Sequence, residues 1–261
     1  MEMLTRTILA LYLAHLLTDF VLQTPGMVKQ KRSGKAAGYA KHGAVYFACG
    51  VLVPGFFVRG LFLSVRFQLA VLGLAVIHLA IDWCKITLAR KTEWADGTAA
   101  FAIDQCAHFL TIVAAGCWIV RVSLGRTLLM FFEAMRAPSD RVLLLIVVYV
   151  GVIFGGGYLI RFMTKPLLKH LQVSESAAQL SSAGMYIGWL ERFLVMTALF
   201  LRSPAMAGLI LTAKSIARYP EFKREQFAEY FLIGTLLSIA AAIVGGIILL
   251  KTFYGSPVSP Q

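Results

Sequence analysis

The chain has 261 residues, of which 59% are hydrophobic and only 15% charged, and its formal net charge is +12. A soluble domain is nearer half apolar and a quarter charged, and a soluble core of this size cannot bury so much apolar surface. Because the positive charges lie mostly between apolar runs and no nucleic-acid reader motif occurs, we exclude nucleic-acid binding and predict a membrane protein.

Apolar runs of about 20 residues, the length that a spanning helix needs, recur along the whole chain. Eight such runs cover residues 6–23, 38–58, 67–89, 100–120, 141–162, 184–201, 203–218 and 230–253. Residues 124–136 have the mixed pattern of a helix that lies at the membrane interface. The runs lack the period-two alternation of a membrane barrel. The predicted fold is therefore all-α, a polytopic transmembrane helical bundle of about eight spanning helices and one interfacial helix.

Three parts follow from this pattern: a four-helix half at residues 1–120, a connector at 121–140 and a second four-helix half at 141–261. The first apolar run has no clear cleavage site, so we interpret it as a retained helix and not as a signal peptide. Lysine and arginine are more frequent in the odd-numbered connections, such as the Lys-rich stretch 29–41, than in the even-numbered ones. The positive-inside rule then places the odd-numbered connections in the cytoplasm and both termini outside.

Histidine and aspartate recur in pairs four residues apart, a spacing that puts both side chains on one helix face. The pairs are His15 with Asp19, His78 with Asp82, and His108 with Asp104. Random placement of five histidines and five aspartates predicts roughly 0.2 such pairs. His42 adds a fourth histidine at the start of the second run. Antiparallel threading brings all seven residues to one leaflet, which the charge rule makes the cytoplasmic one.

Ionisable groups among apolar helices are costly and usually mark a functional site. Imidazole and carboxylate together suit Zn²⁺, Mn²⁺ or Fe²⁺, so we predict one or two divalent transition metals held by these seven residues. Asp19, Asp82 and Asp104 are ligands or catalytic bases in this interpretation. A purely structural hydrogen-bond network and a proton or ion relay are the alternatives.

Other polar residues are candidates for binding a substrate. Gln23 lies four residues after Asp19, and Lys29 and Lys85 lie at the cytoplasmic edge, where they signal topology or attract an anionic headgroup. Glu191, Arg192 and Lys214 interrupt apolar runs in the second half. We expect Glu191 to pair with Lys214 or Arg218, either as a structural ion pair or in recognition of a polar headgroup.

At these motifs the chain resembles an uncharacterised family of bacterial multi-pass membrane proteins, one of the numbered domain-of-unknown-function families. The shared motifs are His-Leu-Leu-Thr-Asp-Phe at 15–20, His42, His-x-x-x-Asp-x-x-Lys at 78–85, Asp-Gln-x-x-His at 104–108, and the segments 188–192, 213–215 and 228–235. The resemblance implies a bacterial cell (inner) membrane and no settled activity. The chain is more weakly similar to membrane-bound metal-dependent hydrolases, which also carry His-x-x-x-Asp motifs, but it lacks their His-Arg…Thr-His-Ser element.

The expected function is metal-dependent hydrolysis of an amphipathic, lipid-like substrate at the cytoplasmic leaflet, with membrane lipids as partners and an oligomer allowed. A metal-ion or proton transporter and a non-catalytic membrane scaffold are the alternatives. The chain has no GxSxG, HExxH or GxxxxGK[ST] motif, so serine-hydrolase, zincin and P-loop mechanisms have no support.

Overall fold

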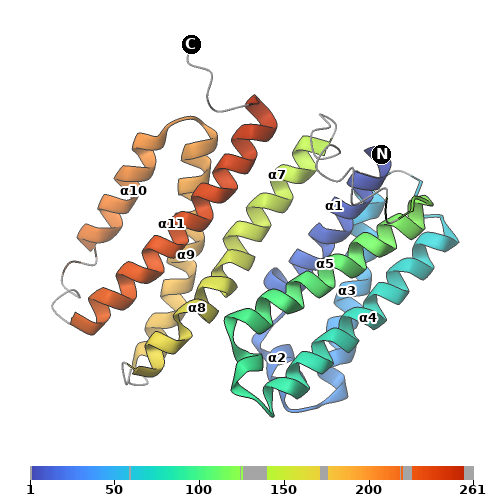
Figure 1. Ribbon diagram of the computed structural model, residues 1–261, viewed down its shortest axis with the longest axis horizontal. Coiled ribbons are helices and arrows are strands. Elements are labelled where there is room, and N and C mark those ends of the chain that lie inside the picture. The colour runs from blue at the N-terminus through green and yellow to red at the C-terminus, as the bar shows by residue number, and fades with distance from the viewer. Residues whose placement is uncertain are drawn as a thin grey trace. The chain divides into compact units, whose positions relative to one another are not determined.

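The computed structural model describes residues 2–58, 60–123, 140–170, 176–217 and 225–255, together with residues 125 and 219. Every element within these ranges is a helix, which confirms the all-α prediction (Figure 1). The described chain divides into two compact units, Met1–Val147 and Val148–Gln261. The interfacial helix expected at 124–136 lies outside the described residues, and the three-part division stays a prediction.

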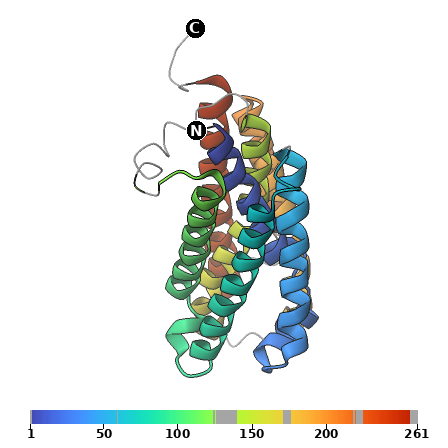
Figure 2. The same cartoon turned by 90° about the vertical axis from the view of Figure 1, so that its right-hand side faces the viewer.

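Unit 1 is a bundle of four long helices. These are α1 (Glu2–Leu16, continued by the π-helical turn η1 at Leu17–Val21), α3 (Ala36–Phe57), α4 (Val65–Ala89) and α5 (Thr98–Val120). Each helix packs against two neighbours, in the order α1, α3, α4, α5 and back to α1 (Figure 2). Glycines let α3 and α4 approach closely, because a Cβ on Gly43 would lie 2.8 Å from Leu79 and one on Gly50 2.8 Å from Val71. Small residues at such contacts are typical of helices that pack in membranes.

Short helices close one end of this bundle. The helix α2 (Pro25–Arg32) lies in the connection between α1 and α3 and overlaps the Lys-rich stretch 29–41. It begins at Thr24, whose hydroxyl accepts a hydrogen bond from the Met27 backbone, and Pro25 occupies its first turn. The 3₁₀ turn η2 (Glu93–Asp96) joins α4 to α5 near the same end.

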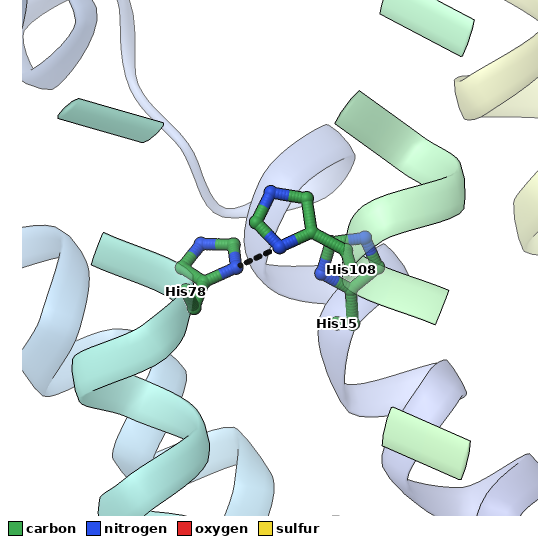
Figure 3. Close-up of side chains that lie close together, drawn as sticks. All are labelled: His15, His78 and His108. Carbon is green, nitrogen blue, oxygen red and sulfur yellow. Dashed lines mark hydrogen bonds between the residues drawn. The ribbon is translucent and has the colours of Figure 1, made fainter. Parts of the chain in front are cut away.

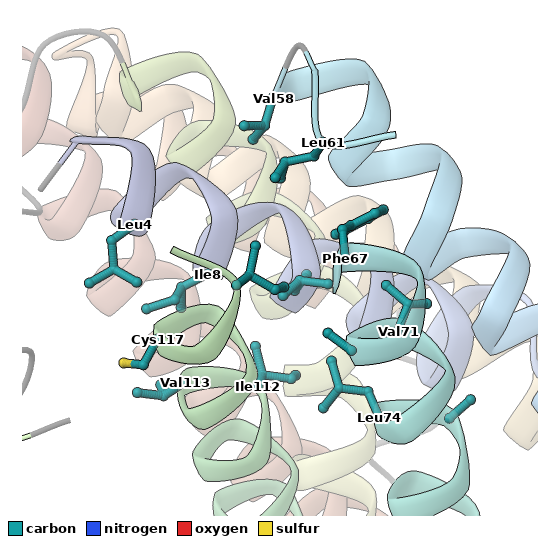
Figure 4. Close-up of a cluster of buried hydrophobic side chains, with 14 of the residues drawn as sticks. Leu4, Ile8, Val58, Leu61, Phe67, Val71, Leu74, Ile112, Val113 and Cys117 are labelled. Carbon is teal, nitrogen blue, oxygen red and sulfur yellow. The ribbon is translucent and has the colours of Figure 1, made fainter. Parts of the chain in front are cut away.

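The opposite half of the bundle is an apolar core. Leu4 and Ile8 of α1, Phe67 and Val71 of α4, and Ile112 of α5 are each at most 3% exposed (Figure 4). These residues come from the first half of α1 and α4 and the second half of α5, so the remaining halves, toward α2, are the ones that carry the histidines and aspartates. The bundle is therefore divided along its axis into an apolar half and a polar half.

Unit 2 consists of helices grouped around α9 (Ser176–Phe200). Its first residues are the end of α7 (Arg141–Val150), a helix that begins in unit 1, and the π-helical turn η4 (Gly151–Gly155) and α8 (Gly156–His170) follow along the chain. Within unit 2, α9 contacts η4, α8, α10 (Pro204–Ala217) and α11 (Glu225–Tyr254).

Five described segments are long and apolar enough to cross a membrane. They are Glu2–Val21, Val65–Ala89, Thr98–Val120, Arg141–Pro166 and Ala228–Tyr254. Exposed apolar residues such as Leu69, Leu72 and Val76 line one face of α4, as expected of a helix that meets lipid. The chain is thus a membrane protein by the length and composition of its helices.

The predicted count of eight spanning helices is not supported. All eight predicted runs fall on helices, but α10 has only 14 residues, which is about 21 Å of helix against a hydrocarbon core of about 30 Å. The other two lose hydropathy to polar residues, since α3 contains Lys41 and His42 and α9 contains Glu191 and Arg192. The number of spanning helices was predicted too high because charged residues within the apolar runs were given too little weight.

Candidate metal centre

The four-helix bundle brings all seven predicted His and Asp residues together in its polar half. His15 and Asp19 come from α1 and η1, His42 from α3, His78 and Asp82 from α4, and Asp104 and His108 from α5. The four histidines are each at most 1% exposed, and Asp82 and Asp104 are 8% and 6% exposed. The clustering expected from antiparallel threading is therefore present in the structure, whereas the chemical role of each residue stays a prediction.

Three donor atoms from three helices lie within ligand distance of one another. Asp19 Oδ1 is 3.3 Å from His42 Nε2 and 3.2 Å from His78 Nε2, and the two imidazole nitrogens are 2.8 Å apart. A tetrahedral ion bound at about 2.0–2.1 Å keeps neighbouring ligand atoms about 3.3 Å apart. These three atoms, which we call the donor triad, therefore have the spacing to hold one divalent cation.

A second carboxylate, that of Asp82, lies beside the donor triad. Asp82 Oδ2 is 3.4 Å from His42 Nε2 and 3.9 Å from His78 Nε2. The same oxygen accepts a 2.6 Å hydrogen bond from the Lys31 ammonium. Because the lysine already binds this oxygen and the distance to His78 is the longest of the set, we do not count Asp82 as a member of the donor triad.

His108 contacts the donor triad through the other nitrogen of His78. The two Nδ1 atoms are 3.1 Å apart (Figure 3), and His108 Nε2 lies 3.6 Å from Asp104 Oδ1 and 3.8 Å from Asp82 Oδ1. If His78 presents Nε2 to a cation, its Nδ1 carries the proton and donates it to His108. Such a partner fixes the tautomer and orientation of a ligating histidine.

The Nδ1 atom of His15 faces the same cluster without a hydrogen-bond partner. Gln105 donates from Nε2 to Asp104 Oδ2 at 3.1 Å, so its Oε1, 3.3 Å from His15 Nε2, is the acceptor of the His15 proton. His15 Nδ1 is then an unprotonated lone pair, buried and without a hydrogen-bond partner, 3.8 Å from Asp19 Oδ2. Two buried acceptors facing each other call for a cation or a proton between them.

Two further sets of possible ligand atoms share a residue with the donor triad. The donor atoms of His15, His78 and His108 lie within 4.8 Å of one another, and so do those of Asp19, Asp82 and His108. The described part of the bundle therefore offers more ligand atoms than a single ion requires.

Asp19 lies in the π-helical turn at the end of α1. Leu22 donates its backbone N–H to the Leu17 carbonyl at 2.8 Å, five residues back, which is the π-helical pattern. Single π-helical turns within α-helices occur frequently at functional sites. Here the turn ends the helix at Val21, so Gln23 lies beyond it in a loop and not on the helix face expected from the sequence.

Three further residues contact the cluster without having been predicted. Lys31 binds Asp82, Gln105 bridges His15 and Asp104, and the Tyr46 ring stacks on His78 with centroids 4.2 Å apart. Gln105 lies inside the Asp104–His108 motif, so that motif was the signal for it. Nothing in the sequence distinguishes Lys31 from the other cations in the stretch 29–41.

The predicted substrate-binding residues of unit 1 lie at different distances from the centre. Gln23 Nε2 is 3.4 Å from the ring nitrogens of His42, and Lys85 donates to Asp104 Oδ2 at 2.7 Å. Lys29 is exposed on α2. A role in substrate binding stays a prediction for all three.

The polar residues predicted in the second half form a separate cluster within unit 2. Lys214 pairs with Glu191, as expected. Arg192 is 3% exposed and donates to the Ile153 carbonyl from Nε at 3.1 Å and Nη2 at 2.6 Å, and to Ser238 at 3.2 Å. Because Ile153 lies in the π-helical turn η4, the guanidinium satisfies a carbonyl where the regular helical pattern is interrupted.

A family described as "Protein of unknown function (DUF3307)" matches residues 7–135. We refer to this matched segment as the DUF3307 domain. All seven His and Asp residues of the cluster, with Lys31 and Lys85, lie inside the DUF3307 domain. The match ends before the C-terminal motifs at 188–192, 213–215 and 228–235. No curated protein and no solved structure matches the chain, so the similarity to metal-dependent hydrolases receives no support from named relatives.

Proposed function

We propose that the DUF3307 domain binds Zn²⁺, Mn²⁺ or Fe²⁺ at the cytoplasmic leaflet of a bacterial inner membrane and hydrolyses an amphipathic, lipid-like substrate. The observation that carries the proposal is the donor triad, whose three interatomic distances lie between 2.8 and 3.3 Å. Two imidazoles and one carboxylate leave a coordination position for water, as in catalytic sites and unlike closed structural ones. A metal in this position lowers the pKa of bound water enough to supply hydroxide near neutral pH.

The surrounding residues support hydrolysis over simple storage of an ion. Asp82 stands beside the fourth position, where a carboxylate can orient water and accept its proton. His108 orients His78 from behind, and Gln105 with Lys85 fixes Asp104. The orientation toward the cytoplasm rests on the basic α2 end of the bundle, where Lys29, Lys31 and Arg32 gather.

Elemental analysis of detergent-purified protein tests the metal. We expect one or two transition-metal ions per chain in the wild type and none in a His42→Ala/His78→Ala variant. His170→Ala is the matched control, because it removes the fifth histidine, which lies at the end of α8 outside the DUF3307 domain. A metal-loaded protein is then offered phospho-lipids and acyl-lipids. Wild-type protein that holds no metal after purification without chelators, with metal supplied, refutes the proposal.

A proton relay is the second candidate, and one observation favours it. His42, His78 and His108 form a chain of ring-nitrogen contacts at 2.8 and 3.1 Å, along which protons can pass. Beyond these three histidines, however, the apolar half of the bundle contains buried residues such as Leu4 and Phe67, which offer no path for a proton. A pH-sensitive dye in liposomes separates the two functions, since hydrolysis predicts no flux and a transporter predicts flux that His78→Ala abolishes.

A further inference from the structure

The helix α2 buries a lysine and no other residue. Of its eight residues only Lys31 is buried, at 3% exposure, while its apolar and other basic residues are half-buried or exposed. Lysine is almost never fully buried unless it is paired, and a helix that packs for stability alone buries apolar side chains. The helix is therefore built to carry one ammonium group into the site.

Contacts at both ends hold α2 in this position. At its start Thr24 caps the first turn, and after its end Arg90 donates to the carbonyls of Arg32 at 2.6 Å and Lys31 at 3.4 Å. Gly38 of α3 lets the helix approach, because a Cβ there would lie 2.7 Å from the Lys31 backbone nitrogen. The Lys31 ammonium then reaches Asp82 Oδ2, the oxygen beside the donor triad.

The charges of the site with one divalent cation bound do not sum to zero. Asp19, Asp82 and Asp104 contribute three negative charges, and Lys31 and Lys85 contribute two positive ones. With neutral histidines and one divalent cation the sum is one net positive charge. An unbalanced charge in a site this buried is costly, so the site favours one more negative charge at the open position. With a cation bound, hydroxide or an anionic substrate oxygen would supply this charge.

We propose that Lys31 forms an anion subsite next to the donor triad, and that it binds the phosphate group of a phosphoester substrate. The inference rests on the proposed function and narrows it, because a neutral acyl ester carries no charge for this ammonium group. The ammonium has three N–H donors, so Lys31 can keep its hydrogen bond to Asp82 and donate to the phosphate oxygens as well. Free phosphate and a phosphate-bearing lipid headgroup share this chemistry.

Phosphate binding by the metal-loaded full-length protein tests the subsite, with inorganic phosphate as the probe and metal content measured in the same samples. Lys31→Gln removes the charge but keeps an N–H donor for Asp82. We expect it to retain the metal and to weaken phosphate binding by about ten-fold or more, as for loss of a charged hydrogen bond. Lys31→Arg, which restores the charge, should recover most of the affinity. Lys35→Met removes an exposed charge from the same end of the bundle and should bind as the wild type does.

The outcomes separate the subsite from the metal. Wild-type protein without metal refutes the proposed function itself. If every sample contains metal and Lys31→Gln binds phosphate as tightly as the wild type, only the subsite is overturned. The subsite is also overturned if Lys31→Arg binds phosphate as weakly as Lys31→Gln does. A second arm uses short-chain phosphatidic acid as a competitor. If phosphatidic acid displaces the bound phosphate at a concentration well below that at which added inorganic phosphate does so, the lipid headgroup is the source of the phosphate group. If the two compounds displace it at equal concentrations, the source is free phosphate.

Discussion

The buried pair between Lys31 and Asp82 gives the sharpest test of how the polar half of the bundle is held together. Its donor and acceptor are 2.6 Å apart and the two residues are 3% and 8% exposed. Removing one member of such a pair leaves the other as an uncompensated buried charge, which costs about 3–5 kcal/mol. In chains of this size each kcal/mol shifts the melting temperature by roughly 2–4 °C, so Asp82→Asn should lower it by roughly 6–20 °C.

The double variant Lys31→Met/Asp82→Asn should recover most of this loss. Neither member is charged in it, and replacing both partners of a buried ion pair is often close to neutral. The measurement is thermal unfolding in detergent with a chelator present, so that metal binding does not contribute. Arg32→Met is the control on the same helix. It breaks the exposed 3.4 Å pair with Asp96, which contributes at most about 1 kcal/mol.

Additivity is the result that would refute this reasoning. If the two single losses simply sum in the double variant, the ammonium and the carboxylate do not interact in the folded protein. The position of α2 over the donor triad would then be wrong, and the anion subsite would fall with it. A coupling of about 2 kcal/mol or more between the two sites supports the contact.

Four further predictions concern single positions and the metal. Asp82→Asn should keep the metal and lose turnover; loss of the metal in elemental analysis would instead make Asp82 the fourth ligand of a closed structural site. Gly38→Ala should destabilise the protein by about 1–3 kcal/mol and weaken phosphate binding, since the new Cβ would lie 2.7 Å from the Lys31 backbone. Unchanged phosphate affinity would contradict the role of α2. Arg192→Met should cost about 1–3 kcal/mol in thermal unfolding, because a buried carbonyl of the π-helical turn η4 loses its donor; wild-type stability would show that water replaces it. Metal added back to chelated protein at 100-fold above its Kd should stabilise the fold by about 2.7 kcal/mol, and a variant without the two triad histidines should show no such gain.

The helical fold and the clustering of the site could be predicted because both depend on periodicity. The two members of each His/Asp pair are four residues apart, and the place of the pairs near alternate ends of successive runs fixes a common depth once the helices are antiparallel. Those two facts required no knowledge of which helix neighbours which. The depth argument holds for all four histidines, whereas the pairing holds for His15, His78 and His108 and not for His42.

The roles within the cluster could not be predicted, because they depend on side-chain geometry across helices. Sequence spacing treats His15 and His42 as equivalent ligands, whereas only His42 reaches both Asp19 and His78 at triad distances. The same limit hid Lys31. Its burial follows from the path of α2, which Gly38 and Arg90 determine from other parts of the chain. Gln23 reaches the cluster through His42, but from the loop after Val21, because the π-helical turn ends the first helix before it.

The surface of α4 argues for a lipid as the source of the phosphate group. An exposed apolar face, formed by Leu69, Leu72 and Val76, runs along this helix toward the polar half of the bundle. Trp83 follows at 56% exposure, where an indole suits the membrane interface. Lys85 comes two residues later but about 200° around the helix, where its ammonium donates to Asp104. The helix that contributes His78 and Asp82 to the site thus also carries an apolar face that meets lipid and an aromatic ring suited to the membrane interface. A free phosphate ion would need neither of these features.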